Sequence, residues 1–394
     1  MPVIYFDNAA TSWPKPPGVR EALSDYLADA GGNPGRSGHR LSIGAARLVE
    51  RARELLAELF NADDPSRIVF TLNATHALNV ALYGLLRPGD HVVTTSVEHN
   101  SVMRPLRHLE TLGVEVTVVA CQLDGTLPLA DVQRALRPGT RLLVTTHASN
   151  VLGTLMPIRE LAALARASGA LYLVDASQTA GAIPIDVDET GVDLLAFTGH
   201  KALLGPTGTG GLYIRDGVDV APIMRGGTGS DSAYETQPAF QPDVHESGTL
   251  NVAGLAGLAA GVRFLFDVGV DAVETHERRL VEQFRAASAD IPGLTLHGPR
   301  ESRHQSGVVS FNLAGAMPSE VAQVLDERFG IMARAGLQCA PSAHRTAGTF
   351  PAGTVRFGFG WFNTAAEVDA AIAALRDIAA WIERGAPALE NVQS

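Results

Sequence analysis

Cysteine is scarce in this sequence, which holds only Cys121 and Cys339 among 394 residues. Their spacing matches no zinc-binding pattern, and two distant cysteines do not make the disulfide framework of a small secreted protein. We therefore expect neither a metal site nor a disulfide.

Long apolar runs are absent as well. No stretch reaches about 18 uncharged apolar residues, so we expect no membrane-spanning helix and no membrane partner. Residues 1–7 do not show the basic segment followed by an apolar one that marks a secretion signal. The expectation is a cytoplasmic protein.

Clustered positive charge is also missing. The chain carries 31 lysine and arginine residues against 42 aspartate and glutamate residues, and its net charge is −11. Nucleic acid is therefore not an expected partner. No G-x-G-x-x-G sequence follows a predicted strand, which argues against dinucleotide binding. There is no internal repeat, and a hydrophobic content of 46% indicates a globular protein with room for two domains.

What the sequence does contain is a regular alternation of apolar runs and helical segments. Predicted strands lie at 68–71, 91–95, 114–119, 141–146, 170–175, 192–198 and 211–215. Helices are predicted over 42–60, from 73 to about 86, and over 158–168. This order predicts an α/β fold with a mostly parallel sheet covered by helices.

Residues 218–250 break this rhythm, because they are rich in glycine and follow no helical or strand period. We interpret them as a loop at an active site or between subunits. The elements predicted beyond them are helices at about 252–267, 271–289, 319–329 and 365–383, and strands near 294–297, 307–313 and 354–357. We expect an N-terminal arm (1–20) that packs with the small domain, a large domain (21–255) and a small α+β C-terminal domain (256–394).

A lysine and an aspartate stand at the carboxyl ends of two of the predicted strands. Asp175 ends the apolar run 170–174, and Lys201 follows the run 194–198 after a turn of small residues. In a parallel α/β sheet both positions face one crevice. A lysine that forms a Schiff base and a carboxylate that keeps a pyridine nitrogen protonated suit pyridoxal phosphate. Taken alone, Lys201 is better explained as a solvated loop lysine, and a helix cap is the alternative for Asp175.

Other polar residues follow strands at the same expected edge. The segment that contains Thr75 and His76 begins a helix directly after a strand, which makes either an anion site or an ordinary helix cap. His99 offers a flat ring for stacking on a cofactor, or is a structural histidine. Asn150 and Gln178 could bond cofactor oxygens, and Thr198 and His200 could reach a phosphate; an Asx-turn is the alternative for Asn150.

Two further candidates lie in the C-terminal half. Cys339 follows a glycine-bearing turn close to Arg334, a setting that favours a reactive thiol. Cys121 follows a β-run and is interpreted as a small buried hydrophobic residue. Arg356 belongs to a predicted strand, and its guanidinium suits a substrate carboxylate, with a surface arginine as the alternative.

Together and in this order, these segments resemble the class V aminotransferase group of fold-type I pyridoxal phosphate enzymes, and in particular its cysteine desulfurase and selenocysteine lyase branch. The segments that match best are residues 147–153, 174–178, 198–201 and 334–340, and the similarity extends over nearly the whole chain. The resemblance implies a fold-type I transferase with a seven-stranded type of sheet in the large domain, and a homodimer.

The resemblance also implies a role for each candidate. Lys201 would carry pyridoxal 5'-phosphate, Asp175 would pair with its ring nitrogen and His99 would stack on the ring. The remaining cofactor-binding positions would be Thr75, His76, Asn150, Gln178, Thr198 and His200, with Thr249 supplied by the other subunit. The substrate would be held by Ala9, His39, Asn150 and Arg356.

The implied activity is conversion of L-cysteine to L-alanine, with the sulfur received by Cys339 as a persulfide and passed to an acceptor protein. Leu337 and Gln338 stand where related desulfurases often have histidines, and His76 where many have an acid. A selenocysteine lyase, another carbon–sulfur lyase or a class V aminotransferase, in which Cys339 is incidental, remain alternatives. So does a sulfur-relay subunit that binds the cofactor and turns over slowly.

Overall fold

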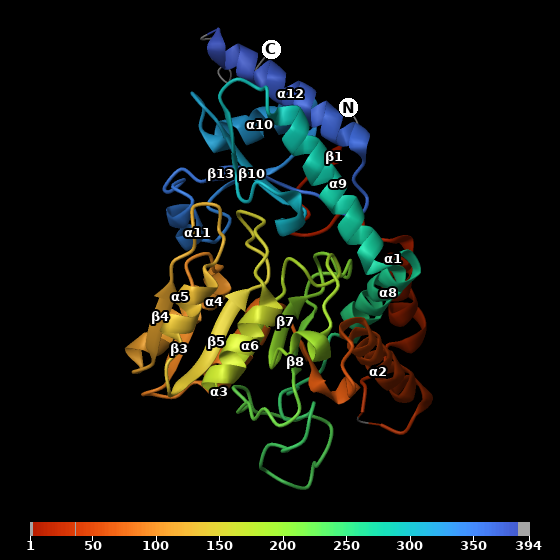
Figure 1. The fold of residues 1–394 in the computed structure, drawn as a ribbon. Coiled ribbons are helices and arrows are strands. Elements are labelled where there is room, and N and C mark those ends of the chain that lie inside the picture. The colour runs from red at the N-terminus through yellow and green to blue at the C-terminus, as the bar shows by residue number, and fades with distance from the viewer. Residues whose placement is uncertain (1–2, 36, 385–394) are drawn as a thin grey trace.

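Figure 1 shows the computed structural model of the protein, which describes residues 3–35 and 37–384. Its larger part is built around a seven-stranded sheet with the order β2-β8-β7-β6-β5-β3-β4. The strands are β2 (Ile68–Thr71), β3 (His91–Thr95), β4 (Glu115–Val119), β5 (Thr140–Thr146), β6 (Leu171–Asp175), β7 (Leu194–Thr198) and β8 (Gly210–Ile214). β8 is antiparallel to both neighbours, and the other strand pairs are parallel. The predicted α/β fold with a mostly parallel sheet is confirmed.

Helices cover both faces of this sheet, as parallel strands with two buried faces require. Successive residues of a strand point to opposite faces, and here they join separate cores. Val92 and Leu173 pack with α3 and α4, whereas Val93 and Val174 belong to the core that contains α2, α6 and α8. The helices of this part are α1 (Pro17–Asp25), α2 (Arg40–Phe60), α3 (Ala74–Leu85), α4 (Asn100–Thr111), α5 (Leu129–Ala135), α6 (Ile158–Ser168), α7 (Val187–Thr190) and α8 (Val252–Val268).

The smaller part is a four-stranded antiparallel sheet with the order β12-β13-β10-β9. The elements of the smaller part are α9 (Val270–Ser288), β9 (Leu294–His297), β10 (Val308–Leu313), α10 (Pro318–Phe329), β12 (Arg334–Gly336), α11 (Pro341–Thr346), β13 (Thr354–Gly358) and α12 (Ala365–Glu383). Figure 1 shows α9, α10 and α12 packed around it. The N-terminal segment joins this part, because β1 (Ile4–Tyr5) pairs with β11 (Ile331–Met332). Phe6 lies in the hydrophobic core of the smaller part, called here the small core; the core that contains α2, α6 and α8 is called the large core.

The change from one core to the other occurs inside α9. Val273 packs in the large core with the apolar side chains of α8, whereas Leu280 and Phe284 belong to the small core. The expected domain boundary at residue 256 falls within α8, whose packing ties it to the large sheet. Among the described residues, no single helix is long and apolar enough to cross a membrane, and only α8 and α9 taken together, bent by 80° at their junction, meet that test.

The segment between β8 and α8 contains no helix or strand, and it extends from the lower edge of the molecule in Figure 1. Large apolar side chains are exposed along it, among them Ile223, Met224, Tyr234 and Phe240. It therefore has the irregular, surface-lying character expected from its sequence.

Candidate active site

A cavity of about 270 Å³ lies between the carboxyl ends of the central strands and the smaller part of the molecule. Residues that follow β6 and β7 line it on one side, and residues of β12 and β13 on the other. The candidates that it brings together are Ala9, Thr75, His99, Asn150, Asp175, Gln178, Thr198, His200, Lys201, Cys339 and Arg356. Most of the residues predicted from the sequence therefore share one cavity.

Lys201 and Asp175 reach this cavity from neighbouring parallel strands, β7 and β6. Burial lowers the pKa of Lys201 to about 8; Asp175 opposes this shift, and Arg356 adds to it. Within the described chain, Lys201 Nζ makes no hydrogen bond or ion pair. The Asp175 carboxylate is 2% exposed and accepts hydrogen bonds from the backbone N–H (3.0 Å) and the hydroxyl of Ser177. The lysine is thus a readily deprotonated amine, which is the form that attacks an aldehyde.

His99 presents a neutral ring to the cavity. Its Nδ1 accepts a hydrogen bond from the Ser101 backbone N–H (3.0 Å) and lies 2.8 Å from Ser101 Oγ. Burial lowers the pKa of His99 to about 4, although Asp175 acts in the opposite direction. Because Nδ1 is an acceptor, the ring proton resides on Nε2. Ser101 Oγ also lies 2.7 Å from Thr75 Oγ1, so the histidine and the threonine are held by one serine.

The region around the start of α3 is rich in unused hydrogen-bond donors. As the first residues of that helix, Ala74 and Thr75 have backbone N–H groups with no acceptor inside the helix, and both line the cavity. The Thr198 hydroxyl is buried and has no partner in the described chain. His200 lies beside it, with Nδ1 2.9 Å from Thr11 Oγ1. This donor set, at the positive end of a helix dipole, suits a phosphate group.

On the opposite side, Arg356 is 2% exposed and donates to the Asn150 backbone oxygen (3.0 Å) and to Asp7 Oδ1 (2.8 Å). Two polar atoms at this place are buried without a described partner, Arg356 Nε and Asn150 Oδ1. The Asn150 amide nitrogen donates to the Gln338 backbone oxygen at 2.7 Å. A guanidinium with an unused N–H beside a cavity can bind a carboxylate.

The two cysteines lie in different settings. Cys339 is exposed and lines the cavity, and the Arg334 guanidinium is 3.9 Å from its sulfur. Cys121 is half-buried, and burial raises its thiol pKa to about 11. The difference favours Cys339 as the reactive thiol.

Three candidates do not reach the cavity of this chain. His39 is exposed and caps α2, with Nδ1 accepting from Ser42 N–H at 3.2 Å. The His76 ring turns back to the Leu72 backbone N–H (3.3 Å), and its own N–H is capped by Asn73. In both cases a local contact near the start of a helix holds the imidazole away from the cavity. Thr249 is exposed, and its predicted role concerns the site of a second subunit.

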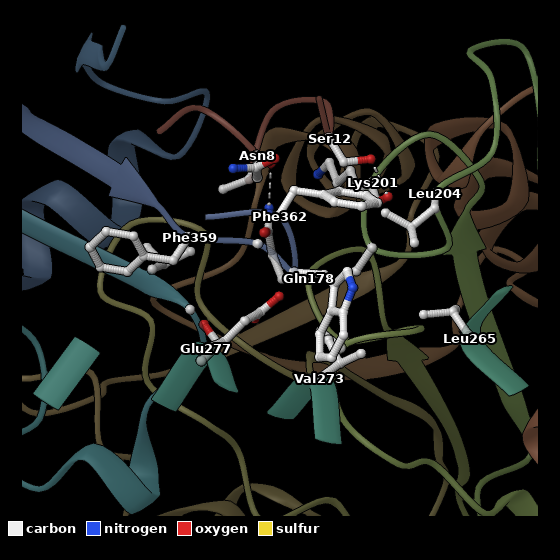
Figure 2. Close-up of a pocket in the computed structure, with 18 residues that line it drawn as sticks. Asn8, Ser12, Gln178, Lys201, Leu204, Leu265, Val273, Glu277, Phe359 and Phe362 are labelled. Atoms are coloured by element: carbon white, nitrogen blue, oxygen red, sulfur yellow. Dashed lines mark hydrogen bonds between the residues drawn. The ribbon is translucent and has the colours of Figure 1, made fainter. Parts of the chain in front are cut away.

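A smaller cavity of about 40 Å³ adjoins the first, and Ala9, Gln178 and Lys201 line both. Figure 2 shows Glu277 of α9 directed into it. Glu277 is 7% exposed and forms no hydrogen bond or ion pair in the described chain; burial raises its pKa to about 8. Nothing in the charged stretch 271–289 distinguished this glutamate.

Within residues 3–35 and 37–384, no group of three or more histidine, cysteine, aspartate or glutamate side chains is arranged to hold a metal ion.

Comparison with known proteins places this geometry in a family. A family model described as aminotransferase class-V matches residues 4–371. The chain belongs to this family. Curated relatives from Pyrococcus abyssi and Methanothermobacter thermautotrophicus, each named "Probable cysteine desulfurase", are 38% and 36% identical to it over 95% of this chain and 94% of their own length. The apo structure of cysteine desulfurase from Thermococcus onnurineus NA1 matches with a TM-score of 0.89 at 35% identity, covering 96% of this chain and 95% of that one.

Membership of the class-V aminotransferase family confirms the resemblance detected in the sequence. This is a family of pyridoxal-phosphate-dependent enzymes, and the strand-end pair of Lys201 and Asp175 is consistent with that chemistry. The chain aligns with its cysteine desulfurase relatives over almost their full length. The protein is accordingly an enzyme of this family.

Proposed function

We propose that this protein is a pyridoxal-phosphate-dependent cysteine desulfurase, which transfers sulfur from L-cysteine to Cys339 and releases L-alanine. The observation that carries the proposal is that an amine of lowered pKa, Lys201, and an exposed thiol, Cys339, line the same cavity. Transamination alone does not require the Cys339 thiol.

The donors around the cavity fit the cofactor. Unused N–H groups at the start of α3 and the unpartnered Thr198 hydroxyl suit a phosphate, with Thr75 and His200 beside them. Lys201 would hold the aldehyde covalently, Asp175 the ring nitrogen and His99 the ring face. Gln178 and Asn150 would serve the ring hydroxyl. When bound, the cofactor supplies an electron sink that stabilises negative charge on the substrate carbon.

Arg356 would bind the substrate carboxylate through its unpartnered Nε–H, and Asn150 through the second N–H of its amide nitrogen, whose other N–H donates to the Gln338 backbone oxygen. Ala9 leaves room beside them, because its side chain is a single methyl group. Once the substrate amino group has replaced it on the aldehyde, Lys201 is a neutral amine, which takes the proton from the substrate α-carbon and later returns one. The lowered pKa of Lys201, which burial causes, makes both transfers accessible near neutral pH.

Cys339 Sγ then attacks the substrate sulfur. A bond forms between Cys339 Sγ and the substrate sulfur, and the bond between that sulfur and the substrate β-carbon breaks. The electron pair of the broken bond stays with the β-carbon, which takes up a proton and becomes the methyl group of L-alanine. The product on the protein is a persulfide, and the Arg334 guanidinium near Sγ can stabilise its negative charge. An acceptor thiol must remove this sulfur before the next cycle, and the exposure of Cys339 permits such a partner to approach.

A homodimer completes the proposal. The segment that contains the exposed Tyr234 and Phe240 leads to Thr249, which would reach the phosphate site of the second subunit. A cytoplasmic location is consistent with two free cysteines and with a thiol acceptor, since a reducing compartment keeps both available.

The direct test is a product assay. The protein, loaded with pyridoxal phosphate and given L-cysteine and dithiothreitol, should form L-alanine and sulfide in equal amounts. Pyruvate and ammonia in place of alanine would identify a carbon–sulfur lyase of another kind, and amino transfer that depends on a keto acid would identify an aminotransferase. Both results would contradict the proposal.

A further inference from the structure

We propose that Gln338 is a positioning residue for the Cys339 thiol, and that the buried His344 fixes the Gln338 carboxamide. The inference rests on the proposed function of Cys339. Gln338 stands where related desulfurases often have a histidine.

The backbone at this place has an uncommon conformation. Gln338 and Cys339 have φ values of 41° and 58°, so two consecutive residues other than glycine lie in the left-handed region. Side chains with a Cβ disfavour this region, and such a conformation persists only where surrounding contacts impose it. It turns Cys339 outward to the cavity, with Sγ 3.9 Å from the Arg334 guanidinium.

The contacts that impose this conformation converge on Gln338, which is 4% exposed. Its Nε2 donates to the Thr354 backbone oxygen at 3.0 Å, and its Oε1 lies 2.7 Å from His344 Nε2. Its backbone oxygen accepts from the Asn150 amide at 2.7 Å. Both ends of the carboxamide and the main-chain carbonyl are therefore engaged, so the residue before the thiol cannot rotate without breaking three hydrogen bonds.

His344 is suited to hold one end of this amide. It is 0% exposed in α11, and burial lowers its pKa to about 4, so the ring is neutral. Its Nδ1 lies 2.7 Å from the Thr349 hydroxyl. With a neutral ring, Nε2 donates to Gln338 Oε1 and Nδ1 accepts from Thr349, and every polar atom of the pair has a partner.

The anchors of Gln338 belong to the elements that bear the proposed substrate carboxylate site. Thr354 begins β13, the strand that carries Arg356, and Asn150 is itself a member of that site. β12, which carries Arg334, pairs with β13. Gln338 thus fixes the distance from the thiol to the place where a substrate carboxylate would bind, which sets how Sγ meets the substrate sulfur.

The test compares Gln338→Leu and Gln338→Gly with Gln323→Leu, which makes the same change at an exposed glutamine of α10. Gln338→Gly guards against failure to fold, because glycine accepts a positive φ without strain. Alanine formation from L-cysteine and the absorbance change of the bound cofactor on adding L-cysteine are both followed. We expect kcat to fall by about tenfold or more in both Gln338 variants, with KM and the absorbance change within about twofold of wild type.

Gln338→His serves as the rescue variant, because imidazole also offers one donor and one acceptor; it should restore kcat to within about threefold of wild type. His344→Phe, which fills the space without a donor, should lower kcat in the same way as Gln338→Leu.

Unchanged kcat in Gln338→Leu and Gln338→Gly, while Cys339→Ser is inactive, would overturn the positioning role and leave the proposed function standing. A rise in KM with normal kcat would overturn it as well, since Gln338 would then act on substrate binding. Full alanine formation by Cys339→Ser would instead overturn the sulfur-transfer proposal and this inference with it.

Discussion

Asp175 is the last residue of β6, Lys201 follows the neighbouring parallel strand β7, and both reach the same cavity of about 270 Å³. The aspartate is fixed by Ser177, whereas the lysine amine has no partner in the described chain. The Asp175 carboxylate is therefore fixed in place, whereas the Lys201 amine is free to react. A cofactor that binds covalently needs both a fixed partner and a reactive amine.

The first prediction concerns the lysine that binds the cofactor. The sequence has two lysines, Lys15 and Lys201, and burial lowers the pKa of each to about 8. Lys15 Nζ already donates to Ser12 Oγ (2.7 Å) and to the His200 backbone oxygen (2.8 Å). Borohydride reduction of the loaded protein should therefore leave the pyridoxyl group on Lys201, as peptide mass spectrometry can establish. The label should persist in Lys15→Arg and vanish in Lys201→Arg, and a label on Lys15 would contradict the assignment.

The second prediction concerns Arg356. Arg356→Ala should lower kcat/KM for L-cysteine by about ten- to a hundredfold, mainly through KM, because a hydrogen bond to a charged group contributes about 1.5–3 kcal/mol. Cofactor absorbance should remain, since Arg356 is not among the proposed cofactor residues. Arg300→Ala, which removes an exposed arginine, is the control and should leave kinetics unchanged. Equal KM values in the two variants would mean that the carboxylate binds elsewhere.

The third prediction concerns assembly. Light scattering should give the mass of a dimer, because the segment with Tyr234 and Phe240 exposes large apolar side chains. Thr249→Ala should weaken cofactor binding, and mixing it with Lys201→Ala should recover activity through one intact site per mixed dimer. A fully active monomer would contradict this arrangement, and so would a mixture no more active than its components.

The fourth prediction concerns pH and Glu277. Burial, together with the neighbouring Glu274, raises the pKa of Glu277 from its ordinary value of 4.5 to about 8. Between these values the unfolded chain loses a proton that the folded chain keeps, so the free energy of unfolding falls as pH rises through this window. Glu277→Gln has no such proton. Its Tm relative to wild type should therefore increase by about 5 °C or more from about pH 5 to about pH 9. Glu282→Gln, at an exposed position of the same helix, should show no such trend, and a parallel course of the Glu277→Gln and wild-type curves would contradict the burial argument.

The large sheet could be predicted because each strand is a short apolar run between helical segments, a pattern that the sequence displays directly. β6, α2 and α12 end within about two residues of their expected limits. The short helices α1, α5, α7 and α11 were not expected, because four to nine residues contain too few helical periods to stand out. Their existence depends on packing against distant elements.

The same distinction applies to the site. Asp175 ends one recognisable strand and Lys201 follows another, so their meeting in one cavity was predictable from chain order. His39 and His76 share the residue type expected of a site, but local hydrogen bonds near the starts of their helices determine where their rings point. Gln338 derives its significance from Thr354, which is 16 residues away along the chain. Only the folded structure shows such a contact.

The measurement that tests the central claim most directly is alanine formation by Cys339→Ser. Serine has nearly the same shape, and its hydroxyl cannot form a persulfide, so the loaded variant should still change its absorbance with L-cysteine and release no alanine. Cys121→Ser should remain near wild type, because burial raises the pKa of that thiol to about 11. Alanine released by Cys339→Ser at the wild-type rate would contradict sulfur transfer through Cys339.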